Sequence, residues 1–356
     1  MGIFSGIITL ESLKISMDML NRISEIDEFK GAWQQFGRLD PDRLSALKTV
    51  ATIESIGSST RIEGAKLSDG EVRLLLSGIE MDSLRTRDEQ EVAGYALACE
   101  KIYEQYSAIP FTENSIKQLH IWLLQYSEKD LRHRGEYKKI PIRIEAFDRR
   151  GMSAGVLFET TSPFETPIKM HELVNWVNQV LEKKTVHSLV AIGIFIVIFL
   201  AIHPFQDGNG RLSRLLTTLL MLKCGYHYAP YSSLESVIEA NKESYYQALQ
   251  ATQKSWQQGQ PDWTPWLQFF LLCLQRQKIH LETKLGGEKV LAEKFSPLHK
   301  KILECLQLHG SLSVSEIEKL TQANRNTLKK ALAKLVKGSL LVLEGYGKST
   351  RYRLAS

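Results

Sequence analysis

One short segment, residues 203–214, brings a base, a carboxylate, a glycine-rich turn and two arginines together. His203 has a side chain that titrates near neutrality and can remove a proton from a hydroxyl group. The turn at residues 208–210 allows several backbone N–H groups to point at one anion. Asp207 beside a phosphate chain is a typical magnesium ligand, because Mg²⁺ takes one or two carboxylates plus phosphate oxygens. The segment therefore predicts chemistry on a phosphorylated ligand.

Apolar segments flank this loop on both sides. Leu189 to Ile202 and Leu215 to Leu222 are each long enough to form a helix. The N-terminus of the second helix adds the positive end of its dipole, and Arg211 and Arg214 lie three residues apart on it, where both can face one ligand. The first run has fourteen apolar residues, fewer than the roughly 20 that a membrane span needs. We therefore expect the central helix of a bundle and no membrane association.

The segment resembles the Fic motif, His-Pro-Phe-x-Asp/Glu-Gly-Asn-Gly-Arg-x-x-Arg, at every specified position. Each part taken alone is more often structural, but an ordinary turn does not require all of them at once. The resemblance implies an all-α Fic core with a small β-hairpin flap over residues 89–277, and transfer of AMP from ATP, with Mg²⁺, to a Ser, Thr or Tyr hydroxyl of a target protein. It implies His203 as general base, Asp207 as metal ligand, Phe205 as core anchor of the nucleotide-binding loop, and Gly208, Asn209, Gly210, Arg211 and Arg214 as the phosphate-binding set.

Three further regions resemble the family. Gly135-Glu136-Tyr137-Lys138 stands where Fic proteins usually carry Gly-x-Tyr-Arg, with lysine in place of arginine. Strand-like pieces at 140–144 and 155–159 predict a hairpin, which by resemblance is the flap that aligns a target through strand addition; Ser162-Pro163 replaces the usual proline pair. The helix that commonly closes over the adenosine would carry Asn241, Tyr245 and Tyr246, for which a capping asparagine and two core tyrosines is the open alternative.

A second motif lies in the N-terminal helical region, residues 1–88. Ser59-Thr60-Arg61-Ile62-Glu63-Gly64 resembles the Fic inhibitory motif, Ser/Thr-x-x-x-Glu-Gly/Asn, at the end of a helix over about residues 44–64. The resemblance implies that Ser59, Glu63 and Gly64 are inhibitory and that Glu63 pairs with Arg214, repels the γ-phosphate and holds ATP unproductively. The same glutamate could instead position a water that removes AMP from a modified protein. The sequence leaves both directions open.

The C-terminal part differs from the rest in charge. Beyond a linker predicted at 278–296, residues 297–356 carry eight lysines and three arginines against four glutamates, a net charge of +7, whereas the remaining chain is at −2. Three short helices followed by a two-stranded hairpin predict a winged-helix (α+β) domain. DNA binding and protein binding are equally open for it. The basic side chains concerned are Arg325, Lys329, Lys330, Lys334, Lys337, Lys348, Arg351 and Arg353.

Composition limits the setting of the protein. The four cysteines are widely scattered, which predicts neither a disulfide framework nor a zinc site. The first residues lack the basic flank of a signal peptide, so we expect a cytoplasmic protein, with secretion or delivery into a host cell as the alternative. The family resemblance implies a homodimer. Two other functions stay open: a DNA-binding regulator whose Fic core senses nucleotide, and a Fic protein that transfers a different phosphate-containing group.

Overall fold

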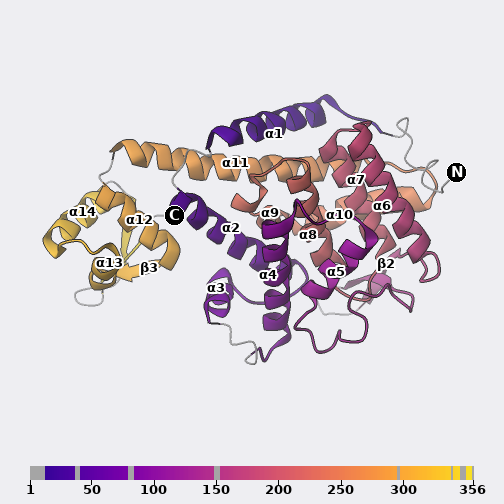
Figure 1. Cartoon of the computed structure of the whole chain (residues 1–356), viewed down its shortest axis with the longest axis horizontal. Coiled ribbons are helices and arrows are strands. Elements are labelled where there is room, and N and C mark those ends of the chain that lie inside the picture. Colours follow the sequence, from indigo (N-terminus) through magenta and orange to yellow (C-terminus); the bar gives the residue numbers. More distant parts are fainter. Residues whose placement is uncertain are drawn as a thin grey trace. The chain divides into compact units, whose positions relative to one another are not determined.

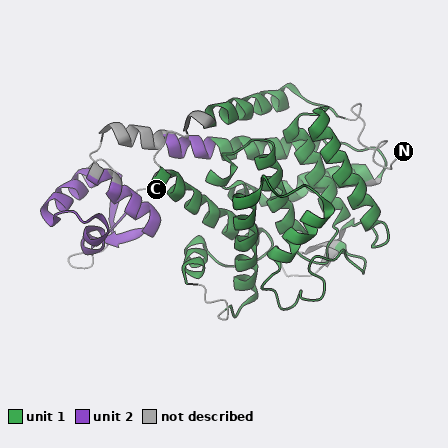
Figure 2. Ribbon diagram, in the orientation of Figure 1, with its two compact units in different colours: residues 1–278 green, residues 279–356 purple. Residues whose placement is uncertain are grey.

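The computed structural model describes residues 13–36, 41–78, 84–147, 153–294, 297–337, 340–344 and 350–354. The chain divides into two compact units, residues 1–278 and 279–356 (Figure 2). The elements that begin in unit 1 are, in chain order, α1 (Met17–Phe36), α2 (Pro41–Ile62), α3 (Asp69–Ser77), α4 (Arg87–Gln105), α5 (Glu113–Leu123), β1 (Arg143–Phe147), β2 (Ser153–Glu159), α6 (Thr166–Lys183), α7 (Ser188–Ile202), α8 (Asn209–Lys223), a 3₁₀ helix (Ala229–Tyr231), α9 (Leu234–Ala240), α10 (Lys242–Gln257) and α11 (Thr264–Lys294).

Helix α7 is the centre of unit 1. Every residue from Leu189 to Ile202 is buried, and α6, α8 and α10 pack against it. Helix α11 contacts it through Trp266, whose indole N–H donates to the Gly193 carbonyl at 2.7 Å. In the part of the chain that the structure describes, no helix is both long and apolar enough to cross a membrane. The apolar run is thus a core helix, as the sequence predicts.

Helix α2 crosses unit 1 and ends beside the loop between α7 and α8. It begins at Pro41, a favoured residue for the first helical turn, and it packs on α4 and α9. Helix α3, which the sequence analysis did not separate, begins with a complete capping box between Ser68 and Glu71. Helix α1 lies along α11 (Figure 1), and Gln275 Nε2 donates to Glu25 Oε2 at 2.7 Å.

The predicted hairpin is present as the antiparallel pair β1–β2, with Arg143 opposite Glu159. Its first strand begins at Arg143, three residues later than predicted. Pro141 has no N–H for a strand ladder, and the Ile142 carbonyl accepts a hydrogen bond from the Thr160 hydroxyl at 2.7 Å. The turn of the hairpin lies outside the described residues.

The described residues of unit 2 form the end of α11, three further helices and a small sheet. The strands β3 (Ser311–Ser313), β4 (Leu341–Glu344) and β5 (Arg351–Leu354) lie in the order β3-β5-β4. Leucines of the first and third of these helices and Ile317 of the second form the core of the unit. Strand β3 was not predicted, so the sheet has one strand more than the expected hairpin. Lys348 and the side chain of Lys337 lie outside the described residues. The three helices are α12 (Pro297–His309), α13 (Val314–Thr321) and α14 (Arg325–Lys337).

The predicted linker, residues 278–296, is helical for most of its length, because α11 continues to Lys294. The prediction of an irregular segment rested on Gly286 and Gly287. Lysine, leucine, glutamate and alanine surround these glycines. Their helix propensity is high enough for α11 to continue past the two glycines.

Candidate active site

The loop between α7 and α8 places the residues of the 203–214 segment. Helix α7 ends where His203 takes a left-handed conformation, with φ 53° and ψ 62°. Its N–H still bonds to the Phe199 carbonyl at 2.9 Å, and Pro204 cannot continue the helix. Gly208 is the N-cap of α8 with φ 78°, a backbone conformation that glycine adopts without strain. The chain therefore reverses direction between two buried helices.

Asn209 and Phe205 hold the loop together. The Asn209 side chain accepts from the Phe205 N–H at 2.9 Å and donates to the Phe205 carbonyl at 2.7 Å. Phe205 is fully buried, which agrees with its expected role as a core anchor. The Asn209 side chain is therefore a structural clamp within the loop, and only its backbone N–H, in the first turn of α8, remains to face an anion.

His203 is partly buried. Burial, followed by the nearby Lys138 ammonium, lowers its pKa to about 4 and favours the uncharged imidazole. Nδ1 lies 3.4 Å from the Leu200 carbonyl. A carbonyl can only accept, so Nδ1 carries the proton in this contact and Nε2 is the basic nitrogen. His203 is thus in the form that can take a proton from a hydroxyl at neutral pH.

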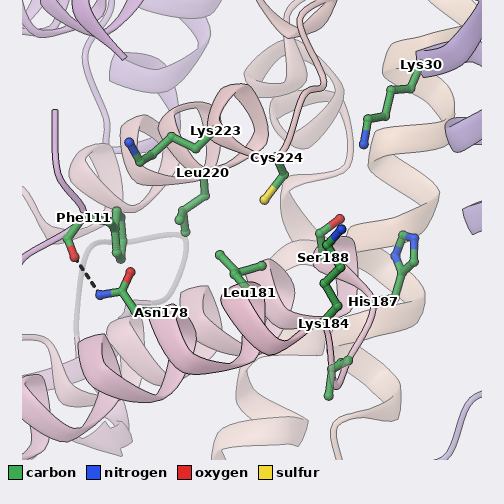
Figure 3. Close-up of a pocket in the computed structure, with 11 residues that line it drawn as sticks. Lys30, Phe111, Asn178, Leu181, Lys184, His187, Ser188, Leu220, Lys223 and Cys224 are labelled. Carbon is green, nitrogen blue, oxygen red and sulfur yellow. Dashed lines mark hydrogen bonds between the residues drawn. The ribbon is translucent and has the colours of Figure 1, made fainter. Parts of the chain in front are cut away.

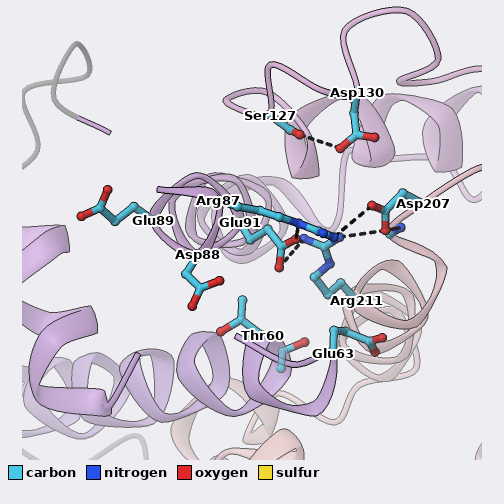
Figure 4. A network of polar contacts seen from close by, with 12 residues as sticks. Thr60, Glu63, Arg87, Asp88, Glu89, Glu91, Ser127, Asp130, Asp207 and Arg211 are labelled. Carbon is cyan, nitrogen blue, oxygen red and sulfur yellow. Dashed lines mark hydrogen bonds and ion pairs between the residues drawn. The ribbon is translucent and has the colours of Figure 1, made fainter. Parts of the chain in front are cut away.

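Asp207 lies among cations (Figure 4). Its Oδ1 accepts from the Gly208 N–H at 2.6 Å and from Arg211 Nη2 at 3.1 Å. Its Oδ2 faces Arg87 at 3.4 Å and Lys129 at 3.9 Å. Burial alone would raise the pKa of Asp207, but Arg211, the Gly208 N–H and the two other cations together hold it below its ordinary value. The carboxylate is therefore charged and has one oxygen directed at exposed groups.

The two arginines of the segment do not meet at one point. Arg211 is 1% exposed and lies between Asp207 and Glu91, with Nη1 3.2 Å from Glu91 Oε2. Arg214 is 3% exposed and points to α2, where its Nε donates to the Ser59 hydroxyl at 2.7 Å. In this structure Arg211 is enclosed by the carboxylates of Asp207 and Glu91, so that both guanidinium groups face one ligand stays a prediction.

The Glu63 carboxylate lies against Arg214 and Gly210. Arg214 Nη2 donates to Glu63 Oε1 at 2.8 Å. The same carboxylate lies on the backbone of Gly210, so closely that a Cβ there would meet Glu63 Cδ at 2.9 Å. Gly64 follows with φ 107° and ends α2. The structure thus brings the Glu63 side chain onto both the glycine turn and the arginine of the 203–214 segment.

The segment and its surroundings can be compared with known proteins. Residues 110–221 match the Fic/DOC family. The chain therefore contains a Fic domain. A crystal structure of a Fic family protein from Desulfovibrio desulfuricans G20 matches with a TM-score of 0.60 and 23% identity, over 96% of this chain and 97% of that one. This likeness supports the fold.

Two sequence relatives of the Fic domain are named as protein adenylyltransferases. A probable protein adenylyltransferase of Aquifex aeolicus is 30% identical over 100 residues, which cover 28% of this chain and 30% of that protein. The protein adenylyltransferase Fic of Drosophila mojavensis is 26% identical over 206 residues, which cover 58% of this chain and 38% of that protein. The matches thus span about a third of the length of these curated relatives.

His120 is a central residue of the Fic domain that the sequence analysis missed. It is fully buried and stacks on Phe205, with ring centroids 3.9 Å apart. Its Nδ1 accepts from the Gly135 N–H at 2.8 Å, so Nε2 carries the hydrogen that is donated to the Asp207 carbonyl at 3.0 Å. Burial lowers its pKa to about 4. Its place between Leu119 and Leu123 on an apolar helix face was the signal that could have identified it.

Lys138, which replaces the usual arginine, joins the hairpin to the catalytic loop. Its buried ammonium donates to the Ile202 carbonyl at 2.9 Å and to the Thr160 hydroxyl at 2.7 Å. Burial lowers its pKa to about 8. The backbone N–H of Lys138 also donates to the Pro204 carbonyl at 2.8 Å. This lysine therefore fixes the base of the flap directly beside His203.

The three residues expected over the adenosine lie at the junction of α9 and α10. Asn241 is held by Arg276 Nη1 at 2.8 Å and donates to the Val237 carbonyl at 2.7 Å. Tyr245 is buried, whereas Tyr246 is 42% exposed. Burial, followed by the Glu63 charge, raises the pKa of Tyr246 to about 12. Of the two tyrosines, only Tyr246 therefore presents a large accessible surface near Glu63.

A cavity of about 710 Å³ lies elsewhere in unit 1 (Figure 3). His187 and Ser188 line it at the N-terminal end of α7, whereas His203 lies at the C-terminal end. Its polar groups are largely paired within the fold: Lys223 Nζ donates to the Ile109 carbonyl at 2.7 Å, and Asn178 donates to the Phe111 carbonyl at 2.8 Å. The cavity is therefore separate from the candidate active site.

The candidate site fits Mg²⁺ through one carboxylate. Within the described ranges, no group of three or more His, Cys, Asp or Glu side chains could hold a metal by itself. Among the described residues, Asp207 Oδ2 pairs with the exposed side chains of Arg87 and Lys129 at 3.4 and 3.9 Å. A carboxylate oxygen whose partners are exposed side chains suits a Mg²⁺ ion that takes its other ligands from phosphates and water. The donor set therefore fits a metal that arrives with a nucleotide.

Proposed function

We propose that the Fic domain transfers AMP from ATP to a Ser, Thr or Tyr hydroxyl of a protein, and that Glu63 restrains this reaction. In the transfer, the hydroxyl oxygen forms a bond to the α-phosphorus. The bond from the α-phosphorus to the oxygen that bridges the α- and β-phosphates breaks, and pyrophosphate leaves. His203 Nε2 takes the proton of the hydroxyl. The two curated relatives named as protein adenylyltransferases support this reaction for the Fic domain.

One observation carries the proposal: a carboxylate of the protein sits on Gly210 and Arg214. A glycine turn at a helix N-terminus and a buried arginine together bind an anion, and Glu63 supplies one from within the chain. We call the Gly208–Gly210 turn and Arg214 together the anion site. Phosphates of ATP would bind the anion site only when Glu63 leaves it. Asp207 would hold Mg²⁺, which when bound offsets the charge of the phosphates.

The test is to supply the Glu63→Gly variant with ATP labelled on either the α- or the γ-phosphate. Label on protein from the α position alone supports AMP transfer. Label from the γ position would make the domain a kinase, and no label with retained ATP binding would make it a nucleotide sensor. The Glu63→Gly/His203→Ala double variant is the matched control, and it should carry no label.

For unit 2, we propose a winged helix that binds DNA. Helices α12, α13 and α14 with strands β4 and β5 follow one another in the order of that domain. On α14, the described side chains of Arg325, Lys329 and Lys330 are exposed, which suits contact with phosphates. Arg325 lies 3.6 Å from Glu318, and Arg351 and Arg353 of the wing pair more closely with Glu316 and Glu344. The basic contact would therefore come from the helix more than from the wing.

A further inference from the structure

The guanidinium group of Arg61 joins the end of α2 to two other elements. Its Nε and Nη2 donate to the two oxygens of Glu239 on α9, at 2.7 and 3.0 Å. Its Nη1 donates to Asp69 Oδ1 at the start of α3 and to the Leu67 carbonyl, both at 2.9 Å. A planar guanidinium suits this arrangement, because it can pair with one carboxylate through two parallel hydrogen bonds and still reach another. We call Arg61, Asp69 and Glu239 the Arg61 latch.

Arg61 and Glu239 favour each other's charged form. The hydrogen bond to Glu239 is the largest cause that raises the pKa of Arg61. Burial would raise the pKa of Glu239, but hydrogen bonds from Arg61 and Ser58 more than offset it and lower that pKa. The side chains of Arg61 and Glu239 are 22% and 29% exposed. The latch is thus an ion pair at the edge of the core, where water can enter when it opens.

Helix α2 provides room for this contact. Gly57 lies one turn before Arg61, and a Cβ at Gly57 would be 2.6 Å from Arg61 Nη1 and 2.5 Å from Asp69 Oδ1. Those distances are shorter than real side chains allow, so any larger residue would push the Arg61–Asp69 contact apart. Gly57 and the Arg61–Asp69 ion pair therefore lie on the same face of α2, and the ion pair fills the space that a side chain at position 57 would need.

The Arg61 latch lies next to Glu63 at the end of α2. Glu63 is two residues beyond Arg61, in a terminal turn where the Glu63 N–H bonds to the Thr60 carbonyl at 3.1 Å. Helix α10 holds the same turn more weakly: Lys242 Nζ lies 3.5 Å from the Arg61 carbonyl, and the Tyr246 hydroxyl lies 3.4 Å from the Ile62 carbonyl. Arg214 also holds this turn, by donating to the Ser59 hydroxyl and carbonyl at 2.7 and 2.9 Å. The ion pairs of Arg61 are what attach the turn to α3 and α9.

We infer that Arg61, paired with Glu239 and Asp69, is a positioning residue that holds Glu63 in the anion site and sets how often that site is free. The inference rests on the proposed function. A protein whose competent state is a minor fraction of the population gains activity in proportion to that fraction. Opening the latch frees the end of α2, so Glu63 leaves Arg214 more often. The latch thereby links the inhibitory carboxylate to α9, the helix that leads into the residues expected over the adenosine.

The experiment compares Arg61→Gln and Glu239→Gln in the full chain, with Glu63 present and in the Glu63→Gly background. With Glu63 present, each variant should raise the initial rate of label transfer from α-labelled ATP about three- to tenfold. In the Glu63→Gly background neither should raise it further. Arg61→Lys should give an intermediate rate, since an ammonium cannot pair with both Glu239 oxygens in parallel. A merely structural role would lower the rate in both backgrounds.

Arg22→Gln is the matched control. The Arg22 side chain is 20% exposed and pairs with Asp18 at 2.8 Å, but it lies on α1. This variant should leave the rate of label transfer unchanged. If Glu63→Gly activates the enzyme and both Arg61→Gln and Glu239→Gln keep the wild-type rate, the latch is overturned and the proposed function stands. If Glu63→Gly itself fails to activate, restraint by Glu63 fails, and the latch fails with it. If Arg61→Gln does not fold, as thermal unfolding would reveal, Glu239→Gln decides.

Discussion

Arg214 Nη2 and Glu63 Oε1 form a 2.8 Å salt bridge between residues 151 positions apart in the chain. Arg214 is almost fully buried, whereas the Glu63 side chain is 33% exposed. A buried guanidinium without an anion is costly, because removing one partner of a buried ion pair leaves an uncompensated charge. Glu63 is the anionic partner of Arg214 in this structure. In the proposed function, a nucleotide phosphate takes the place of the Glu63 carboxylate.

The pH dependence of the reaction should reflect the buried state of His203. Its pKa of about 4 means that the unprotonated base is fully present above about pH 5. The Glu63 charge raises this pKa, so in the Glu63→Gly variant kcat/KM should complete its rise below about pH 5 and stay level to about pH 7.5. Lys138→Gln removes a cation that lowers this pKa and should move the rise to higher pH. A rise centred near pH 6.5 in Glu63→Gly would contradict the description of His203.

His120→Phe should destabilise the Fic domain and make its stability less sensitive to acid. The new ring can stack on Phe205, but the Gly135 N–H and the Asp207 carbonyl lose their partner, which costs about 1–3 kcal/mol each. The folded-state pKa of His120, about 4, lies below the unfolded value near 6.5. Its contribution to stability is thus complete above pH 6.5 and is lost as pH falls towards 4.

The measurement for His120 is urea unfolding at several pH values. Between pH 6.5 and 4, the unfolding free energy of the wild type should fall more steeply than that of His120→Phe, by about 1.4 kcal/mol per pH unit. Equal slopes would mean that His120 is not held neutral in the fold.

Asp207→Asn should weaken the use of Mg²⁺. Asparagine can still accept from the Gly208 N–H, but it lacks the charge that Mg²⁺ prefers. In the Glu63→Gly background, we expect EDTA to stop label transfer, and Asp207→Asn to raise the Mg²⁺ concentration for half-maximal rate about tenfold or more. Asp88→Asn is the control, since the Asp88 carboxylate accepts a hydrogen bond from the Lys66 N–H and is not the expected metal ligand. An unchanged Mg²⁺ requirement in Asp207→Asn would exclude this carboxylate as the ligand.

Charge reversal on α14 tests the proposal for unit 2. The full chain should bind a random-sequence DNA duplex, measured by fluorescence anisotropy, with an affinity that falls steeply as salt is raised. Lys329→Glu/Lys330→Glu should weaken binding at least about tenfold. Lys301→Glu, at an exposed lysine on α12, should change it less than about twofold. Absence of binding, or equal loss in both variants, would speak for a protein partner or none.

Local signals in the sequence predicted much of this fold. Proline at the start of α2, the capping box of α13 between Ser313 and Glu316, and the apolar run of α7 each specify their element within a few residues. The loop between α7 and α8 was predictable for the same reason: a proline and two glycines fix its turns.

The partners of the site residues were not predictable in the same way. Arg211 is enclosed by Glu91 from another helix, and His120 reaches the Asp207 carbonyl across 87 residues. Such contacts depend on how helices pack, which no local pattern encodes. The sequence therefore placed the chemical groups near one another but did not separate the arginine that faces the anion site from the one that supports the loop.

The most direct test of the account is the initial rate of protein labelling from α-labelled ATP by the wild type and by Glu63→Gly, at equal folded concentrations. The account predicts a rate about 10–100-fold higher in Glu63→Gly, since the competent state would otherwise be a minor fraction, and no labelling when His203→Ala is added. An equal or lower rate in Glu63→Gly would contradict it.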